Sequence, residues 1–353
     1  MYIKKITDTL SSSAFFGRGY VNDGMGKAGR FILNEMKQIG LEVSEQKFTY
    51  AVNTFPGKMT LVINGKQLQP GIDFIVAPES RTVQGAGLLR QSDSVTWTNR
   101  EHKIMITMVD KLTMSVSEGQ ANYTAFKVLK SADLLTAFSS DIEAKMERKF
   151  NCANIAGTIM GTTRPDSIIV FTAHFDHLGG MGATTYFPGA NDNAGGVALM
   201  LSLAKYYKAH PSPYTMMFIA FAGEEAGLLG SKYYVEHPLK PLNQIRFLIN
   251  LDLVGNGEEG ITVVNASIFP TEFGLLQQIN NKKQLFTTVN SRGKAANSDH
   301  YWFSEKGVPS FFIYTLGKRK SYHDVQDISA TVPWFEVNDL SELLVDFADN
   351  LIR

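Results

Sequence analysis

The stretch I-I-V-F-T-A-H-F-D, residues 168–176, decides the fold, because an unbroken apolar run stops there at a histidine and an aspartate. The same pattern returns in M-F-I-A-F-A-G-E-E at 217–225 and in F-L-I-N-L-D at 247–252. Short apolar runs of this kind are typical of strands buried on both faces of a parallel sheet. Ligands of open α/β sheets gather beyond the carboxyl ends of such strands. The sequence therefore predicts one pocket that receives the polar residues between and after these runs: His174, Asp192, Glu224, Glu225 and Asp252.

These side chains are chemically suited to binding a metal. Several carboxylates in one pocket repel each other unless a cation is present. Imidazole and carboxylate groups are ligands for zinc and similar divalent metals. A second imidazole is supplied by His323, which again lies beyond an apolar run at 308–314. The composition of the pocket therefore predicts a metal site.

Six short motifs follow one another in the chain: H-F-D at 174–176, N-D-N at 191–193, G-E-E at 223–225, L-D at 251–252, S-D-H at 298–300 and Y-H at 322–323. Each is weak alone, but together and in this order they resemble the co-catalytic dizinc exopeptidases of the bacterial leucyl aminopeptidase and aminopeptidase Y type. Relatives of that family include glutaminyl cyclases and glutamate carboxypeptidase. The resemblance covers roughly residues 10–40 and 154–353. It implies a three-layer α/β/α sandwich with a mixed, mostly parallel central sheet.

The resemblance also implies two zinc ions, or other divalent metals, in each chain. His174, Asp192 and Asp252 would complete one metal site, and Asp192, Glu225 and His323 the other. Asp192 would bridge the two metals with one oxygen to each, as co-catalytic centres need. Considered alone, Asp192 is expected to cap the helix that follows it, and the two roles are compatible.

The remaining polar residues of these motifs receive other implied roles. Glu224 would be the general base, taking a proton from the water that the metals activate and then protonating the leaving amine. Asp176 would accept the second N–H of the His174 imidazole. Tyr322 matches a position whose hydroxyl can stabilise the tetrahedral oxyanion. His177 has no matching ligand role and is interpreted as a pocket wall or a helix-capping side chain.

Two parts of the family pattern are less clear in this chain. Asp324 follows His323 where the family often has threonine, so a different local loop is expected, although Asp327 keeps the downstream carboxylate. Residues 298–300 match a pocket-lining segment without individual roles.

Periodicity predicts the elements around the site. Apolar spacing predicts a helix over 25–39 and an edge strand over 41–50, neither with a chemical role. Further helices are predicted over 194–207, 227–235, 273–284 and 337–351, and strands over 214–222 and 308–315. Gly195 and Gly196 are expected to let a helix approach another backbone closely. The alternation of strands and helices is typical of an α/β/α sandwich.

Residues 51–153 contain short β-rich segments separated by glycine, proline, asparagine or aspartate. We interpret this stretch as an inserted β-rich module within a zinc peptidase domain that comprises 1–50 and 154–353. A reduced protease-associated domain is one interpretation of the module, and an elaborated edge of the main sheet is the other.

Composition excludes several classes of protein. Of 353 residues, 44% are hydrophobic and 19% charged, which argues against disorder. Lys+Arg and Asp+Glu both number 34, so no global field favours nucleic acid or an acidic membrane. Cys152 is the only cysteine, which excludes an intrachain disulfide, and it is predicted to be a buried small residue. No apolar run reaches membrane-spanning length and the start has no signal-peptide core, so the chain is predicted to be soluble. It would be cytoplasmic, or periplasmic or secreted if a leader was removed.

The function predicted from these residues is that of a dizinc aminopeptidase, which hydrolyses the peptide bond next to the free amino terminus of a peptide. Within the same fold, the alternatives are a glutaminyl cyclase and a carboxypeptidase for acidic C-termini. The carboxypeptidase would need arginines in the pocket, which the sequence does not place. A binding protein without catalytic activity is a further alternative, which the complete ligand set disfavours.

Overall fold

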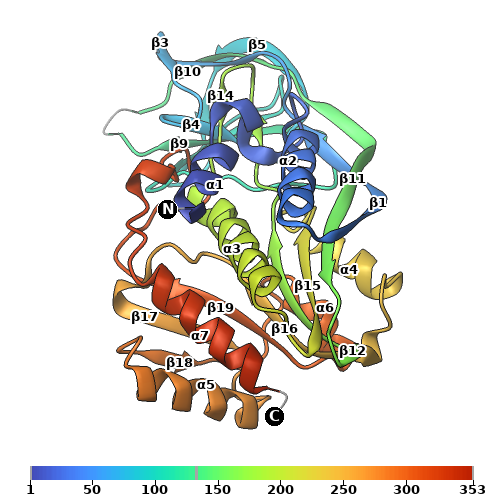
Figure 1. The fold of residues 1–353 in the computed structure, drawn as a ribbon. Helices are drawn as coiled ribbons and strands as arrows, with labels where there is room; N and C mark the ends of the chain where they lie inside the picture. Colours follow the sequence, from blue (N-terminus) through green and yellow to red (C-terminus); the bar gives the residue numbers. More distant parts are fainter. Residues whose placement is uncertain (1, 132–133, 352–353) are drawn as a thin grey trace.

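The computed structural model describes residues 2–131 and 134–351. Its main sheet has eight strands in the order β1-β11-β15-β12-β16-β19-β17-β18 (Figure 1). Their bounds, in that order, are Glu42–Thr54, Lys145–Ile159, Tyr214–Phe221, Arg164–His174, Ile245–Leu251, Ser310–Leu316, Gly260–Val264 and Val289–Ser291. The central strands β15, β12, β16 and β19 are parallel, whereas β11 and β17 run antiparallel to their central neighbours.

Helices cover both faces of this sheet (Figure 1). One hydrophobic cluster joins a sheet face to α1 (Tyr2–Leu10), α2 (Gly24–Ile39), α3 (Gly195–Ala209), α5 (Pro270–Lys283) and α7 (Val337–Asn350). A second joins the opposite face to α4 (Leu229–Glu236) and α6 (His300–Glu305). Within β12, Ile169 and Phe171 belong to the first cluster, while Ile168 and Val170 belong to the second. The apolar run is therefore buried on both faces, and the predicted three-layer α/β/α sandwich is confirmed.

The predicted elements of the sandwich are present with shifts of a few residues at their ends. The strand predicted over 41–50 is β1, which lies at the sheet edge as expected and continues to Thr54. It pairs antiparallel with β11. The first half of β11 is mostly polar and at most partly buried, so it lacks the apolar pattern of a buried strand.

Between β1 and β11 the chain forms two further small sheets. One has the order β3-β2-β10-β5 (Lys66–Leu68, Met59–Ile63, Ala137–Ile142 and Val83–Leu88), and the other β4-β9-β8-β7-β6 (Phe74–Val76, Thr124–Leu129, Ile104–Val109, Thr96–Asn99 and Arg90–Gln91). They share a hydrophobic cluster of their own that includes Leu61, Phe74 and Phe126. We infer that the insertion comprises residues 55–144, because β1 and β11 themselves belong to the main sheet. Its relation to a protease-associated domain stays a prediction.

Short elements complete the chain. They are η1 (Ser13–Arg18), β13 (Gly180–Met181), β14 (Thr185–Tyr186), η2 (Ala190–Ala194), η3 (Leu242–Gln244), η4 (Gly257–Glu259) and η5 (Ser329–Thr331). Within the described ranges, every helix is too short or too polar to cross a membrane. Cys152, expected to be buried, is only partly buried on β11, the second strand from the sheet edge.

Candidate metal centre

The predicted site residues meet at the carboxyl ends of the central strands. His174 is the last residue of β12, Glu224 and Glu225 follow β15, and Asp252 follows β16. Because β12 lies between the other two strands and parallel to both, their carboxyl ends reach the same edge of the sheet. A cavity of about 280 Å³ opens there, and all six metal-ligand and base candidates line it: His174, Asp192, Glu224, Glu225, Asp252 and His323.

Asp192 lies between two imidazoles and divides its carboxylate between them. Its Oδ1 is 3.3 Å from His174 Nε2, and its Oδ2 is 3.1 Å from His323 Nε2. His174 Nε2 is also 3.4 Å from Asp252 Oδ1, and His323 Nε2 is 3.2 Å from Glu225 Oε2. The site thus consists of two sets of ligand atoms that share one aspartate.

The backbone around Asp192 is fixed by a buried carboxylate from a distant segment. Asp327 accepts hydrogen bonds from the backbone N–H of Asn191, at 2.9 Å, and of Asp192, at 3.0 Å. An ion pair with Arg319, 2.9 Å from Oδ1, balances the charge of Asp327. The downstream carboxylate of the family pattern therefore holds the η2 segment in place.

The helix after η2 is capped by a different residue from the expected one. Asn193 Oδ1, and not the Asp192 carboxylate, accepts the backbone N–H of Gly196, because Asp192 is turned toward the two imidazoles. A Cβ atom on Gly196 would lie 2.7 Å from the carbonyl oxygen of Leu251. The expected close approach of the first turn of α3 to another backbone is confirmed.

A buried arginine joins the first residues of the chain to the site. Arg18, which is 0% exposed, donates hydrogen bonds to the backbone carbonyls of Leu10, Phe175, Pro188, Gly189 and Asp192. Its guanidinium thus ties together the segments that carry His174 and Asp192. Burial lowers the pKa of Arg18 to about 10, and the carboxylates of the site oppose that shift. The sequence offered only the G-R-G stretch at 17–19 as a signal for this role.

Asp176 contacts His174 differently from what the resemblance implied. His174 Nδ1 lies 3.0 Å from the backbone carbonyl oxygen of Asp176 and 3.9 Å from its carboxylate. The carboxylate instead accepts the backbone N–H groups of Glu224, at 3.1 Å, and Glu225, at 3.3 Å. The side chain therefore holds the turn after β15, while the main chain orients the imidazole. Burial raises the pKa of Asp176 to about 7.

His177 is the site residue that sequence reasoning assigned least well. It is fully buried, and its Nδ1 lies 2.7 Å from Glu225 Oε1 and 3.9 Å from Asp192 Oδ1. It caps no helix; it contacts the carboxylates directly. The spacing of two histidines three residues apart, at 174 and 177, was the available signal.

Glu224 and Glu225 point to different halves of the site, as expected for successive residues. Glu225 faces His177 and His323, whereas Glu224 Oε2 lies 4.0 Å from His174 Nε2. Gly223 adopts a positive φ of 72° at the turn before them, a conformation that glycine adopts without strain. Burial raises the pKa of Glu224 well above its usual value, and neighbouring carboxylates add to this effect while His174 opposes it.

The inserted segment contributes directly to the position of His323. The main chain of Met114 donates its N–H to the His323 carbonyl at 2.9 Å, and its own carbonyl lies 3.0 Å from His323 Nδ1. Asp324, which departs from the family pattern, lies 3.4 Å from Lys111 Nζ and accepts the Tyr322 N–H. The different residue at position 324 thus connects this loop to the insertion.

Tyr322 lies at the opening of the cavity. Its ring stacks on that of His323 with 3.9 Å between centroids, and 44% of the residue is exposed. Burial of the hydroxyl region and the nearby carboxylates raise the pKa of Tyr322, so the phenol stays protonated and can donate a hydrogen bond.

Residues 298–300 support the site from behind and do not line the cavity. Ser298 Oγ donates to Asp252 Oδ2 at 3.1 Å and accepts a hydrogen bond from Asn250. Asp299 and His300 are fully buried where α6 begins, in the layer of helices beyond the sheet. The wall consists instead of residues that the sequence did not indicate: Leu253, Arg292, Asn297, Phe312 and Tyr314.

The side chains present fit two divalent cations. Potential ligand atoms of His174, Glu224 and Asp252 lie within 4.8 Å of one another, and so do those of His177, Asp192 and Glu225. These groups overlap the two predicted ligand sets but contain Glu224 and His177 in addition. Asp252 Oδ1 is buried and forms no well-aligned hydrogen bond among the described residues, although His174 Nε2 lies 3.4 Å away. A buried carboxylate oxygen without a well-aligned hydrogen bond is costly, and a bound cation would remove that cost.

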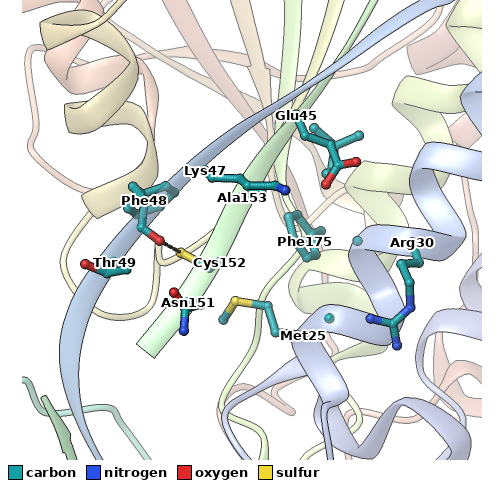
Figure 2. Close-up of a pocket in the computed structure, with 13 residues that line it drawn as sticks. Met25, Arg30, Glu45, Lys47, Phe48, Thr49, Asn151, Cys152, Ala153 and Phe175 are labelled. Atoms are coloured by element: carbon teal, nitrogen blue, oxygen red, sulfur yellow. Dashed lines mark hydrogen bonds between the residues drawn. The ribbon is translucent and has the colours of Figure 1, made fainter. Parts of the chain in front are cut away.

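A larger cavity of about 490 Å³ lies elsewhere, between α2 and the β1–β11 pair (Figure 2). Met25, Ile155 and Phe175 give it apolar walls, and Glu45 is the single carboxylate among the described residues that line it. Size alone therefore does not identify the chemical site of this molecule.

Residues 154–348, more than half of the chain, match the family described as Peptidase family M28. The chain belongs to peptidase family M28. The matched segment contains all five predicted metal ligands and Glu224, while the insertion lies outside it.

Individual curated proteins resemble the chain over different lengths. Aminopeptidase YwaD of Bacillus subtilis is 31% identical over 183 residues, which cover 49% of this chain and 39% of that protein. A probable leucine aminopeptidase of Arthroderma otae is 29% identical over 217 residues, covering 59% of this chain and 60% of that protein. The chain thus spans less than two thirds of these relatives.

The structure of BSAP, a zinc aminopeptidase from Bacillus subtilis, superposes with a TM-score of 0.75 at 21% identity. That likeness covers 98% of this chain and 94% of the other, insertion included. It shows that the two chains share their fold.

Proposed function

We propose that this protein is a dizinc aminopeptidase that removes single residues from the free amino terminus of short peptides. One observation carries the proposal: the two oxygens of Asp192 face two separate sets of ligand atoms, at 3.3 Å from His174 and 3.1 Å from His323. A bridging carboxylate of this kind is what a co-catalytic pair of metals needs. The names of two similar proteins, aminopeptidase YwaD and a probable leucine aminopeptidase, support the same activity.

In this proposal His174, Asp192 and Asp252 hold one ion, and Asp192, Glu225 and His323 hold the other. Bound there, the two cations would polarise the scissile carbonyl and lower the pKa of water. His177 and Ser298, which contact Glu225 and Asp252, would orient these ligands.

Glu224 is the carboxylate left for proton transfer. Its raised pKa suits a group that first accepts a proton from water and then gives it to the leaving amine. The protonated hydroxyl of Tyr322 lies at the cavity opening, where it would donate a hydrogen bond to the oxyanion. The Asp176 carboxylate holds the Glu224 backbone and so keeps the base in place.

The small cavity supports a short substrate. About 280 Å³ accommodates little more than a few side chains, and the insertion lies beside it through the contact of Met114 with His323. A free amino group would be positioned by the carboxylates of the site next to the scissile carbonyl.

The test compares a peptide with its acetylated twin, using protein of measured metal content. Mass spectrometry should show stepwise loss of residues from the free amino terminus and resistance of the acetylated peptide. Equal cleavage of both peptides, or loss of residues from the C-terminus, would contradict the proposal. Loss of ammonia from a peptide that begins with glutamine, without hydrolysis of any peptide, would favour a glutaminyl cyclase.

A further inference from the structure

One cationic side chain lines the catalytic cavity without an assigned role. Arg292 is the single arginine or lysine among the described residues that form the wall. It directly follows β18, and its backbone N–H donates to the Val263 carbonyl at 2.9 Å, which fixes the start of its loop. Its side chain is exposed and has no ion pair or hydrogen bond within the described ranges.

Arg319 is an arginine of this protein with a structural role. Its guanidinium lies 2.9 Å from Asp327 and also contacts the Gln326 carbonyl and the Thr331 hydroxyl. The carboxylates of the metal site do not pair with Arg292 within 4 Å, since they face the histidines. The Arg292 guanidinium is therefore available to a ligand.

The neighbouring wall makes this part of the cavity amphipathic. Leu253 follows the metal-site aspartate, and Phe312 and Tyr314 stand two residues apart on β19, so they share one face of that strand. Asn297 adds an amide on the same loop as Arg292. An apolar wall that leads to a guanidinium suits a substrate group with an apolar portion and a terminal carboxylate.

We propose that Arg292 determines specificity by binding a carboxylate of the substrate. Guanidinium groups bind carboxylates in a fork-like, bidentate geometry that lysine does not reproduce. The carboxylate has two sources in a peptide substrate: an acidic first side chain, or the C-terminus of a dipeptide or tripeptide. This inference rests on the proposed peptidase function and specifies which peptides the site prefers.

The experiment measures kcat and KM for two matched substrate pairs. One pair is the dipeptide Leu-Leu as the free acid and as its amide, and the other is a pentapeptide amide that begins with glutamate or with methionine. The wild type is compared with Arg292→Gln and Arg292→Lys. Arg246→Gln serves as the control, because Arg246 is exposed and lies outside the catalytic cavity.

Arg292→Gln should lower kcat/KM by about tenfold for at least one carboxylate-bearing substrate, mainly through KM, as expected for a charge-assisted hydrogen bond. The value of kcat/KM for the neutral substrate of the same pair should not change. Arg292→Lys should lower kcat/KM less than Arg292→Gln does. The pair that responds identifies the source of the carboxylate. Equal effects on charged and neutral twins, or no effect on either, would overturn the proposal.

A binding measurement separates this inference from the proposed activity. Calorimetry with the same peptides and the metal-loaded Glu224→Gln protein, with and without Arg292→Gln, needs no turnover. Preference for the carboxylate-bearing twin that disappears with Arg292→Gln supports the inference even if the wild type cleaves none of these peptides. Absence of any preference in the Glu224→Gln protein counts against it, whatever the activity.

Discussion

Two cavities among the described residues differ in their surroundings more than in their size. The larger, of about 490 Å³, lies between α2 and the β1–β11 pair and has mostly apolar walls (Figure 2). The smaller, of about 280 Å³, gathers histidines and carboxylates where parallel strands end. Phe175 lines the larger cavity and stands between His174 and Asp176, so the two regions are close. The chemistry of this protein therefore lies where parallel strands end, and a larger volume does not mark it.

The largest effect on metal content and activity is expected from Asp192→Ala, in the smaller cavity. Removal of the carboxylate shared by both ligand sets should reduce the bound metal and lower kcat by at least about 10⁴-fold, the upper end of what acid–base catalysis alone contributes. Elemental analysis and kinetics check this outcome. Asp166→Ala, an exposed aspartate at the far end of β12, is the matched control and should change neither quantity. Two tightly bound ions in the Asp192→Ala protein would be incompatible with a bridging role.

Glu224→Gln should keep both ions and the fold but lower kcat by about 10²–10⁴-fold, the usual contribution of a general base. The amide keeps the size of the side chain and loses its ability to accept and return a proton. Circular dichroism, metal content and steady-state kinetics check the three parts of the prediction. Glu236→Gln, on the exposed side of α4, is the control. A nearly normal kcat with full metal content would exclude Glu224 as the base.

Two histidines contact Glu225, and their loss should have different effects on metal binding. His323→Ala should remove one of the two ions, because His323 Nε2 faces Asp192 and Glu225 at 3.1 and 3.2 Å. His177→Ala should retain both ions and lower metal affinity or activity by about 10–100-fold, as expected when a residue that orients a ligand is lost. Metal titrations of both variants distinguish these two roles, and His210→Ala on the surface is the control. Loss of an ion from the His177 variant, with both ions retained in the His323 variant, would mean that His177 is the metal ligand and His323 the orienting residue.

The smallest effect is expected in the larger cavity. A Cβ atom on Gly29 of α2 would lie 3.5 Å from the Phe175 ring, an ordinary contact. Gly29→Ala should therefore raise the free energy of unfolding by about 0.5–1 kcal/mol, the helix propensity difference between the two residues, without changing kcat/KM. Gly196→Ala is the contrasting variant, because its Cβ would meet the Leu251 carbonyl oxygen at 2.7 Å. Denaturant titration measures the free energy of unfolding of both variants. A loss of activity in Gly29→Ala would mean that the larger cavity is coupled to the metal site.

The sequence predicted the sandwich and the meeting of the site residues because both follow from strand patterns. His174 and Asp252 end continuous apolar runs, and parallel strands bring such ends together. The roles of Asp176 were not predictable from this pattern. Whether His174 Nδ1 meets the backbone or the side chain of a residue two positions away depends on backbone geometry.

Contacts between segments far apart in the chain could not be predicted from the sequence either. Met114 contacts His323 across 209 positions, and nothing in its local pattern marks it as part of the site. Arg292 lies in a polar segment without periodicity, so only the folded chain places it in the cavity wall. His177 lies beside a recognised motif, but the motif does not specify its partner Glu225.

The hydrogen bonds of Arg18 have a consequence for the order in which the site is completed during protein synthesis. A ribosome makes residue 18 well before most of its partners, because four of the carbonyls it binds belong to residues 157 to 174 positions later. The Arg18 guanidinium therefore remains without these partners until the segments that carry His174 and Asp192 have left the ribosome. Because a charge without partners is unfavourable in a dry interior, Arg18 becomes buried only after those later residues have been made. The first and middle parts of the chain thus reach their final state together.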